Sequence, residues 1–258
     1  MVYFIFIINN HNYYFTLFKF FRTFAVIGSP VTHMSAGTGM GKSLNLQLDS
    51  KHDGVKPALQ GRSRQRQSEL INAGIKLLCE KNISEISIIE LTATCGYTVG
   101  TFYSRFDDKD SFFFAVQEAA VAKMVSLIKE GFSDPAWKTA SAEEIFANLV
   151  DITVDVLESE LRGVVKESIL ASCSNQKIWI PIRECGRQMA KIILELLEPL
   201  YLENEPEESI KSIQFGLQMF YGTLVQAAIN NPGPVKLEDP EFRENLTRML
   251  TQYAKLKP

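Results

Sequence analysis

The sequence predicts an all-α protein. From about residue 64 onward, apolar residues recur at the three-to-four-residue spacing of helices, and the periodic runs end at proline, glycine or polar clusters. No stretch in this part alternates as a β-strand would. With 258 residues and 46% hydrophobic content, the chain can bury one large core or two smaller ones. We expect a small helical domain at residues 62–110 and a larger helical bundle at residues 111–258.

The small domain is predicted to hold three helices. The first ends near residues 81–82 and has an apolar side formed by Leu70, Ala73, Ile75, Leu77 and Leu78. Ser87 is an N-cap for the second, at about residues 88–94, and Glu90 three positions later completes a capping box. The second helix stops at Gly96, and the third covers about residues 99–106.

The larger domain is predicted to begin with a long helix from Lys109 to about residue 130, capped by Asp107 and Asp108 and followed by Pro135. Further helices are predicted at about residues 142–158 and 161–171, then from Pro181 onward, and at about residues 207–230 and 240–255.

The last two helices carry apolar residues on two faces, so both faces must be covered. One face can pack on its own domain, and the other is free for a second copy. Two helices from each of two chains would form a four-helix bundle, which predicts a symmetric homodimer. The alternative is a larger monomeric core. The candidate dimerisation residues are Leu217, Phe220, Leu224, Leu246, Met249 and Tyr253.

Two short helices joined by a tight turn at Gly96 have the pattern of a helix-turn-helix, whose second helix lies in the DNA major groove. Glycine suits a turn that needs a positive φ. Leu91, Phe102 and Phe106 are expected to hold the pair on the first helix. The outward face of the second is small, hydroxyl-bearing or aromatic, and so fits a groove: Thr98, Val99, Gly100, Thr101, Tyr103 and Ser104.

Basic residues flank this motif, although the whole chain has a net charge of −3 and a pI near 5.8. A local basic patch must therefore supply the attraction to DNA. Arg62, Arg64 and Arg66 precede the first helix, and Lys109 begins the fourth, where helix N–H groups also attract a phosphate. Together with Ser87, these residues complete the candidate DNA-binding set.

The stretch at residues 64–116 resembles the DNA-binding domain of the TetR (TetR/AcrR) family of bacterial transcriptional regulators. In "GYTVGTFYSRFDDKDSFFFAV", the family's pattern runs through Gly96, Thr98, Gly100, Thr101, Tyr103, Phe106 and Lys109. The resemblance implies contacts of Thr98, Thr101 and Tyr103 with DNA backbone or bases, and a phosphate held by Lys109. Val99 replaces a basic residue often found there, which removes a phosphate contact.

The resemblance also implies a function. It predicts about nine helices, a homodimer that reads a near-palindromic operator in double-stranded DNA, and a C-terminal domain whose small-molecule ligand alters the affinity for DNA. The predicted function is a ligand-responsive transcriptional regulator, a repressor released from its operator by the effector, although some relatives activate instead.

The effector pocket is predicted to be mostly apolar. Its candidate lining residues are Phe146, Trp179, Met189, Phe220 and Tyr221, although each of them taken singly is better explained as an ordinary core residue. The three histidines all precede residue 53, and the four cysteines are widely separated, so neither forms a catalytic or metal-ligand pattern. We therefore predict no enzyme activity, metal or cofactor, in a cytoplasmic protein.

Residues 1–61 are predicted to form a disordered leader. Ten of the chain's 27 aromatic residues fall in its first 24 positions, but a polar run at residues 9–12 interrupts the apolar stretch, so neither a membrane span nor a secretory signal fits well. Because Phe, Tyr, Ile, Asn and Lys share A/T-rich codons, we interpret this stretch as a translated upstream region, with Met34 or Met40 as the start. The alternative is a membrane-tethered regulator anchored by residues 1–27.

A second alternative comes from "AGTGMGKS", residues 36–43, which nearly matches the phosphate-binding loop of nucleotide-hydrolysing proteins. Ala36 takes the place of the first glycine. No helix of useful length follows the loop, and no set of strands is available to build a parallel sheet around it. A nucleotide hydrolase using Lys42 and Ser43 therefore competes with a simpler reading, a flexible linker.

Overall fold

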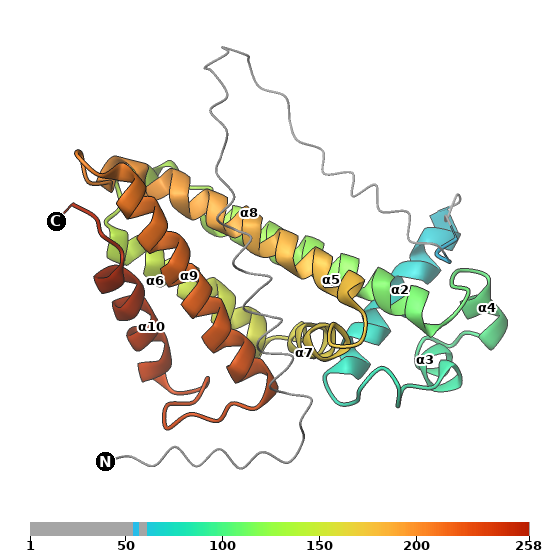
Figure 1. The fold of residues 1–258 in the computed structure, drawn as a ribbon. Helices are drawn as coiled ribbons and strands as arrows, with labels where there is room; N and C mark the ends of the chain where they lie inside the picture. The colour runs from blue at the N-terminus through green and yellow to red at the C-terminus, as the bar shows by residue number, and fades with distance from the viewer. Residues whose placement is uncertain (1–53, 57–60, 258) are drawn as a thin grey trace. The chain divides into compact units, whose positions relative to one another are not determined.

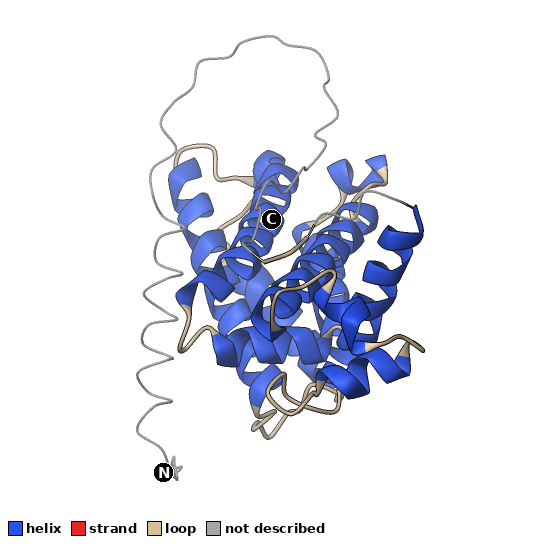
Figure 2. Cartoon of the chain, turned by 90° about the vertical axis from the view of Figure 1, so that its right-hand side faces the viewer, coloured by secondary structure: helices blue, strands red, loops and turns tan. Residues whose placement is uncertain are grey.

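The computed structural model describes residues 54–56 and 61–257, which lie in one compact unit, Ser35–Pro258. The described part of the chain folds into nine α-helices and three short 3-10 helices, and it contains no β-strand (Figures 1 and 2). The predicted all-α fold is confirmed. The predictions for residues 1–53, which include the phosphate-binding loop with Lys42 and Ser43, the membrane anchor at residues 1–27 and the starts at Met34 and Met40, lie outside the described residues.

The first three helices are α2 (Gly61–Leu78), α3 (Ile88–Thr94) and α4 (Val99–Tyr103). They enclose a small core of fully or almost fully buried side chains, among them Leu70, Leu91, Phe102 and Phe106, as predicted. The rings of Phe102 and Phe106 also lie against Phe112 of the next helix, with centroids 5.5 and 5.1 Å from it. Helix α4 ends three residues earlier than predicted because the chain turns after Tyr103 and brings Phe106 back into this core.

Part of the predicted leader is ordered. Val55 forms an isolated antiparallel bridge with Phe106, and the Lys56 N–H donates to Arg105 O at 2.8 Å. Residues 54–56, which belong to the predicted leader, therefore pack against the small helical domain.

Helix α5 (Lys109–Gly131) begins with a capping box, in which the Ser111 N–H donates to the Asp108 carboxylate and the Ser111 hydroxyl accepts from the Asp108 N–H. Among the described helices, α5 alone has the length and apolar composition needed to cross a membrane. However, 56% of its most apolar 18-residue stretch is buried inside the protein. Because α5 contacts α2, α6, α7 and α8, it is the core helix around which both domains are built.

The remaining helices build the larger domain. They are α6 (Ala142–Glu158), α7 (Arg162–Ala171), α8 (Trp179–Leu197), α9 (Pro206–Ile229) and α10 (Pro240–Tyr253), with 3-10 turns at Pro135–Thr139, Gln176–Ile178 and Glu198–Leu200. Helix α6 has the predicted bounds. Helix α8 begins two residues before Pro181, the predicted start, because proline is tolerated in the first helical turn, where its missing N–H has no partner in any case.

Helix α10 packs along both α6 and α9, as Figure 1 shows at the C-terminal end of the chain. One side chain of α10 forms ion pairs with three carboxylates of α6: the Arg243 guanidinium binds Asp151, Asp155 and Glu158 at 3.0, 2.7 and 2.8 Å. Helix α7 lies between the first domain and α9, since it contacts both α2 and α9.

Candidate nucleic-acid interface

The turn between α3 and α4 is closed by backbone hydrogen bonds. The Tyr97 N–H donates to Thr92 O at 2.8 Å, and the Gly96 N–H donates to Ala93 O at 3.0 Å, the pair of bonds that defines a Schellman motif. Gly96 itself has a φ of +69°, a conformation that strains any residue with a side chain. The tight turn predicted at Gly96 is therefore present, and it fixes the angle between the two helices.

The outward face of α4 is open to solvent. Tyr103 is 47% exposed, Val99 is 37% exposed, and Thr98, Gly100 and Ser104 are also exposed. Thr101 is partly buried, and its hydroxyl lies 3.3 Å from that of Thr98. Phe102, on the opposite side, is fully buried. The helix thus presents hydroxyls, small residues and one aromatic ring on a surface without charge.

The N-terminal end of α4 is held by a polar network that the sequence did not reveal. Tyr97, in the turn, donates its hydroxyl to the Glu69 carboxylate of α2, and this hydrogen bond lowers the pKa of Glu69 while it raises the pKa of Tyr97. The Arg66 guanidinium lies over the Tyr97 ring, 5.9 Å from its centroid. Arg66, one of the arginines predicted to bind DNA, therefore contacts the turn that precedes α4.

The other two arginines lie nearby on α2. All three are exposed in its first turns. Arg62 and Arg66 are four residues apart and share one face of the helix, whereas Arg64 lies on a different side. The structure thus brings Arg62 and Arg66 together and separates Arg64 from them.

Ser87 and Lys109 each make a structural contact as well. Ser87 caps α3 by accepting the Glu90 N–H at 3.0 Å. The predicted capping box is incomplete, because the Glu90 carboxylate pairs with Lys81 and does not return to the Ser87 N–H. The Lys109 ammonium donates to Ser84 O at 3.1 Å, which holds it against the loop between α2 and α3.

The five predicted effector residues are all buried. Phe146 lies on α6, Trp179 and Met189 on α8, and Phe220 and Tyr221 on α9. They pack in the core of the larger domain, and none of them lines the surface pockets described below.

A buried amide near this core was missed by sequence reasoning. Gln117 of α5 is fully buried and donates from its amide nitrogen to the Ser168 hydroxyl and to Ile178 O, both at 2.8 Å. Its amide oxygen has no hydrogen-bond partner among the described residues. A buried acceptor without a donor is unfavourable, so this is a point where a donor group of a ligand would be stabilised.

The contact between the two domains centres on the start of α7. A Cβ added at Gly163 would lie 2.2 Å from Leu78 O, so only glycine permits this approach of α7 to the end of α2. The Cys79 thiol donates to Glu160 O at 3.1 Å, and the nearly buried Glu167 carboxylate accepts from the Ile83 N–H. The end of α2 and the loop after it are therefore attached at three points to α7 and to the residue pair before it.

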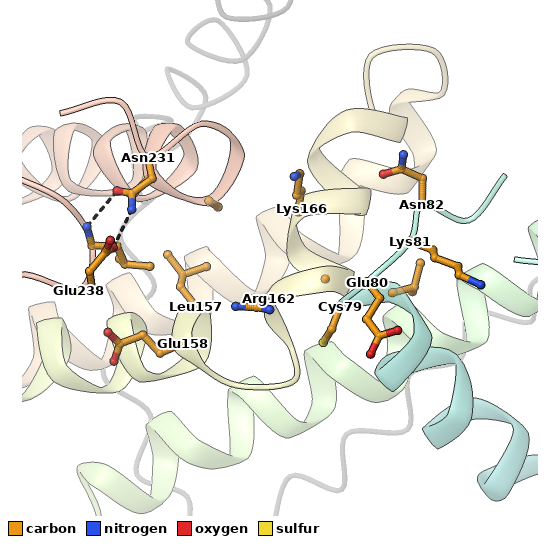
Figure 3. A pocket seen from close by; sticks show the side chains of 15 residues that line it. Cys79, Glu80, Lys81, Asn82, Leu157, Glu158, Arg162, Lys166, Asn231 and Glu238 are labelled. Atoms are coloured by element: carbon orange, nitrogen blue, oxygen red, sulfur yellow. Dashed lines mark hydrogen bonds between the residues drawn. The ribbon is translucent and has the colours of Figure 1, made fainter. Parts of the chain in front are cut away.

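A pocket of about 650 Å³ opens beside this contact (Figure 3). Its lining comes from the end of α2, the turn between α6 and α7, and the end of α9 with the loop that follows, where Asn231 bonds Glu238. Residues of the small helical domain and of the larger domain therefore line the same pocket.

The dimerisation residues predicted from the sequence are mostly buried within the protomer. Leu217, Phe220, Leu224 and Leu246 are each less than 9% exposed. Met249 is partly buried, and Tyr253 is 48% exposed. The exposed apolar residues of α9 are instead Phe215 and Met219, which belong to the other stripe of the helix.

Three exposed residues and the partly buried Met249 form one surface, which we name the α9–α10 patch: Phe215, Met219, Met249 and Tyr253. The Phe215 and Tyr253 rings lie 5.6 Å apart, and a shallow pocket of about 540 Å³ lies between the two helices. Contiguous exposed apolar patches are frequent at protein interaction sites, so this surface is a candidate for one.

Comparisons with known proteins agree with this geometry. Residues 70–116 match the family model described as "Bacterial regulatory proteins, tetR family". No curated protein sequence matches the chain.

Solved structures share the fold. A TetR-family transcriptional regulator from Streptomyces coelicolor is similar with a TM-score of 0.57 and 14% identity, over 74% of this chain and 79% of that one. GusR from Salmonella enterica gives 0.55 and 14%, over 77% and 100%. A TetR/AcrR-family regulator from Thermobifida fusca YX-ER1 gives 0.52 and 18%, over 72% and 97%. Residues 70–116 are therefore similar to the regulatory proteins of the tetR family, and the chain shares the fold of these solved structures.

Proposed function

We propose that the protein is a homodimeric, ligand-responsive transcriptional regulator that binds a near-palindromic operator and acts as a repressor released by a hydrophobic small molecule. The observation that carries DNA binding is the exposed face of α4, held on a buried aromatic core in a helix-turn-helix. A helix presented in this way enters the major groove with its side chains toward the base edges.

In this proposal Thr98, Thr101 and Tyr103 contact DNA backbone or bases, with Val99 and Gly100 allowing close approach. Their hydroxyls suit phosphates and base edges, and the Val99 methyl groups suit a thymine methyl. The DNA backbone is held by Ser87, Lys109 and the exposed arginines Arg62, Arg64 and Arg66, which supply the salt-dependent part of the affinity.

The second copy of the chain covers the α9–α10 patch. Its four large apolar side chains are the natural centre of an interface formed by two helices from each protomer. A two-fold dimer then holds two recognition helices about 34 Å apart, one turn of DNA, which is the spacing that a near-palindromic operator requires.

The effector binds in the core of the larger domain, where the candidate residues Phe146, Trp179, Met189, Phe220 and Tyr221 supply apolar surface. Gln117 supports this location, because its unpaired amide oxygen offers a hydrogen bond to a donor on the ligand. Gln117 lies on α5 and bonds α7 through Ser168. Both helices also contact α2, so a ligand at this point acts on the two elements that position the DNA-binding domain.

An effector weakens DNA binding by binding more tightly to a conformation in which the two recognition helices do not match the spacing of the DNA grooves. The loss of DNA affinity is limited by the difference between the effector's affinities for the two conformations. This function needs no cofactor or catalytic group, and we infer that the protein acts as a regulator in the cytoplasm and not as an enzyme.

The proposal is tested by selecting binding sites for the full-length protein from a random DNA library at physiological salt, and then screening hydrophobic small molecules for release of the selected site. We expect an enriched inverted repeat and release by a subset of the compounds. Enrichment of no sequence over bulk DNA would overturn the DNA-binding proposal, and enrichment without any release would overturn the effector proposal alone.

A further inference from the structure

The recognition helix has a second support, at its C-terminal end, which comes from a segment outside the matched domain. Residues 54–56 precede the region that matches the family model, residues 70–116. They lie along the turn after α4: the Asp107 N–H donates to Gly54 O at 3.0 Å, and the Lys56 N–H donates to Arg105 O at 2.8 Å. The Val55–Phe106 bridge completes this pairing.

Lys56 reaches from this segment to the end of α4. Its ammonium donates to Tyr103 O at 2.9 Å and forms an ion pair with Asp107 at 2.7 Å. Tyr103 is the last residue of α4, and the carbonyls at a helix C-terminus lack partners within the helix. A cation at this position satisfies such a carbonyl and interacts favourably with the helix dipole.

The support matters because α4 is five residues long. A helix this short is not stable by itself, so its position depends on what holds its ends. The Tyr97–Glu69 hydrogen bond holds the N-terminal end. At the C-terminal end, the exposed Asp107 carboxylate lies four residues after Tyr103, where an uncompensated negative charge would repel DNA phosphates.

We propose that residues 54–56 are a functional part of the DNA-binding domain and that Lys56 is a positioning residue for DNA recognition. Lys56 holds the C-terminal end of the recognition helix through Tyr103 O, and it neutralises Asp107 beside the DNA. This inference rests on the proposed function, because it concerns the affinity for the operator.

The test compares full-length wild type with Lys56→Ala, Asp107→Asn and the double variant. Affinity is measured for a selected operator and for unrelated DNA at several salt concentrations. We expect Lys56→Ala to weaken operator binding about tenfold and to weaken binding to unrelated DNA less, because the recognition helix is displaced. Asp107→Asn alone leaves Lys56 on Tyr103 O, so it should not weaken binding. In the double variant, removal of the bare carboxylate should restore part of the loss.

The matched control is Lys123→Ala, which removes another half-exposed lysine paired with a carboxylate, Glu160, at 3.0 Å and remote from α4. It should leave operator affinity unchanged. Thermal unfolding of Lys56→Ala should match wild type closely, since exposed ion pairs contribute little to stability.

Equal operator affinity of Lys56→Ala and wild type would overturn the inference. The inference would also be overturned if Lys56→Ala lowered the affinity for operator and for unrelated DNA by the same factor and the added Asp107→Asn substitution restored neither. A wild-type protein that selects no DNA sequence would instead overturn the proposed function.

Discussion

Two helices of this protein present a half-exposed tyrosine, and the surfaces around them differ. Tyr103 of α4 is 47% exposed and is surrounded by hydroxyls, glycine and a small aliphatic residue. Tyr253 of α10 is 48% exposed and is surrounded by Phe215, Met219 and Met249. The first surface suits polar base edges and phosphates, and the second suits another apolar surface. The two tyrosines are almost equally exposed, so it is the residues around them that indicate different partners.

The two surfaces also differ in how they are supported. Helix α4 is short and depends on polar contacts from α2 and from residues 54–56. Helix α10 is held along its length by α6 and α9 and by Arg243, which binds three carboxylates of α6. The position of the proposed DNA surface therefore depends on a few polar contacts, whereas the α9–α10 patch is supported along the length of α10.

The largest expected effect comes from placing a charge in the patch. Met219→Glu would bury an unpaired carboxylate in the proposed dimer interface, which is unfavourable by several kcal/mol. We expect a monomer by light scattering at micromolar concentration, and a loss of operator affinity of about 100-fold or more, because only one half-site remains. Lys191→Gln, the same change in charge at an exposed site on α8, is the control. A Met219→Glu protein that is still a dimer would show that the patch is not the interface.

The matched pair Tyr103→Ala and Tyr253→Ala sharpens the comparison. We expect Tyr103→Ala to weaken operator binding about 10- to 100-fold while the dimer persists. Tyr253→Ala should raise the dissociation constant of the dimer and leave the affinity of the assembled dimer for DNA nearly unchanged. Analytical ultracentrifugation and fluorescence anisotropy separate the two. If both substitutions changed both quantities equally, the two surfaces would not be distinct.

Gly163→Ala tests the connection between the two regions. The added methyl group would lie 2.2 Å from Leu78 O, so α7 must move away from α2. We expect the free energy of unfolding to fall by about 1 to 3 kcal/mol. Gly186→Ala is the control on α8, since its Cβ would meet nothing within 4 Å. Removing a helical glycine there should stabilise the protein by up to about 1 kcal/mol. Equal effects in chemical denaturation would remove the special role of Gly163.

The smallest expected effect concerns Glu167 at the same contact. Burial raises the pKa of this carboxyl above its ordinary value of 4.5, more than the hydrogen bond from the Ile83 N–H lowers it. The folded state then holds the proton more tightly than the unfolded state, so this group's contribution to stability is present below about pH 4.5 and is lost as the pH rises through the raised pKa.

Glu167→Gln keeps an acceptor for the Ile83 N–H and has no proton to lose. We expect its free energy of unfolding, relative to wild type, to increase with pH above 4.5, by about 1 kcal/mol or less. Denaturation curves of both proteins between pH 4.5 and 7.5 measure this difference. A difference independent of pH would contradict the buried-carboxylate account.

The sequence predicted the fold well where local signals operate. Helix α3 follows the Ser87 cap and ends before Gly96, and helix α6 has the predicted bounds, because caps and glycine turns act over a few residues. The exposed face of α4 was also predictable, since the alternation of Phe102 and Phe106 with polar residues fixes which side is buried.

Contacts between distant residues were not predictable in the same way. Lys56 and Tyr103 are 47 positions apart, and Gln117 and Ser168 are 51 apart, so no spacing rule connects them. The exposed stripe of α9 was not predictable for another reason. Helix α9 has apolar stripes on two faces, and periodicity alone does not say which stripe the protomer uses for its own core; the structure buries Leu217 and Phe220 and exposes Phe215 and Met219.

The most direct test of the central claim is hydroxyl-radical footprinting of the full-length protein on the DNA upstream of its own gene, at physiological salt, with Tyr103→Ala in parallel. The account predicts two protected windows about one helical turn apart on one face of the DNA, which the Tyr103→Ala protein loses at the same concentration. Absence of any protected window, or windows that Tyr103→Ala leaves unchanged, would contradict the assignment of α4 as the recognition helix of a dimeric regulator.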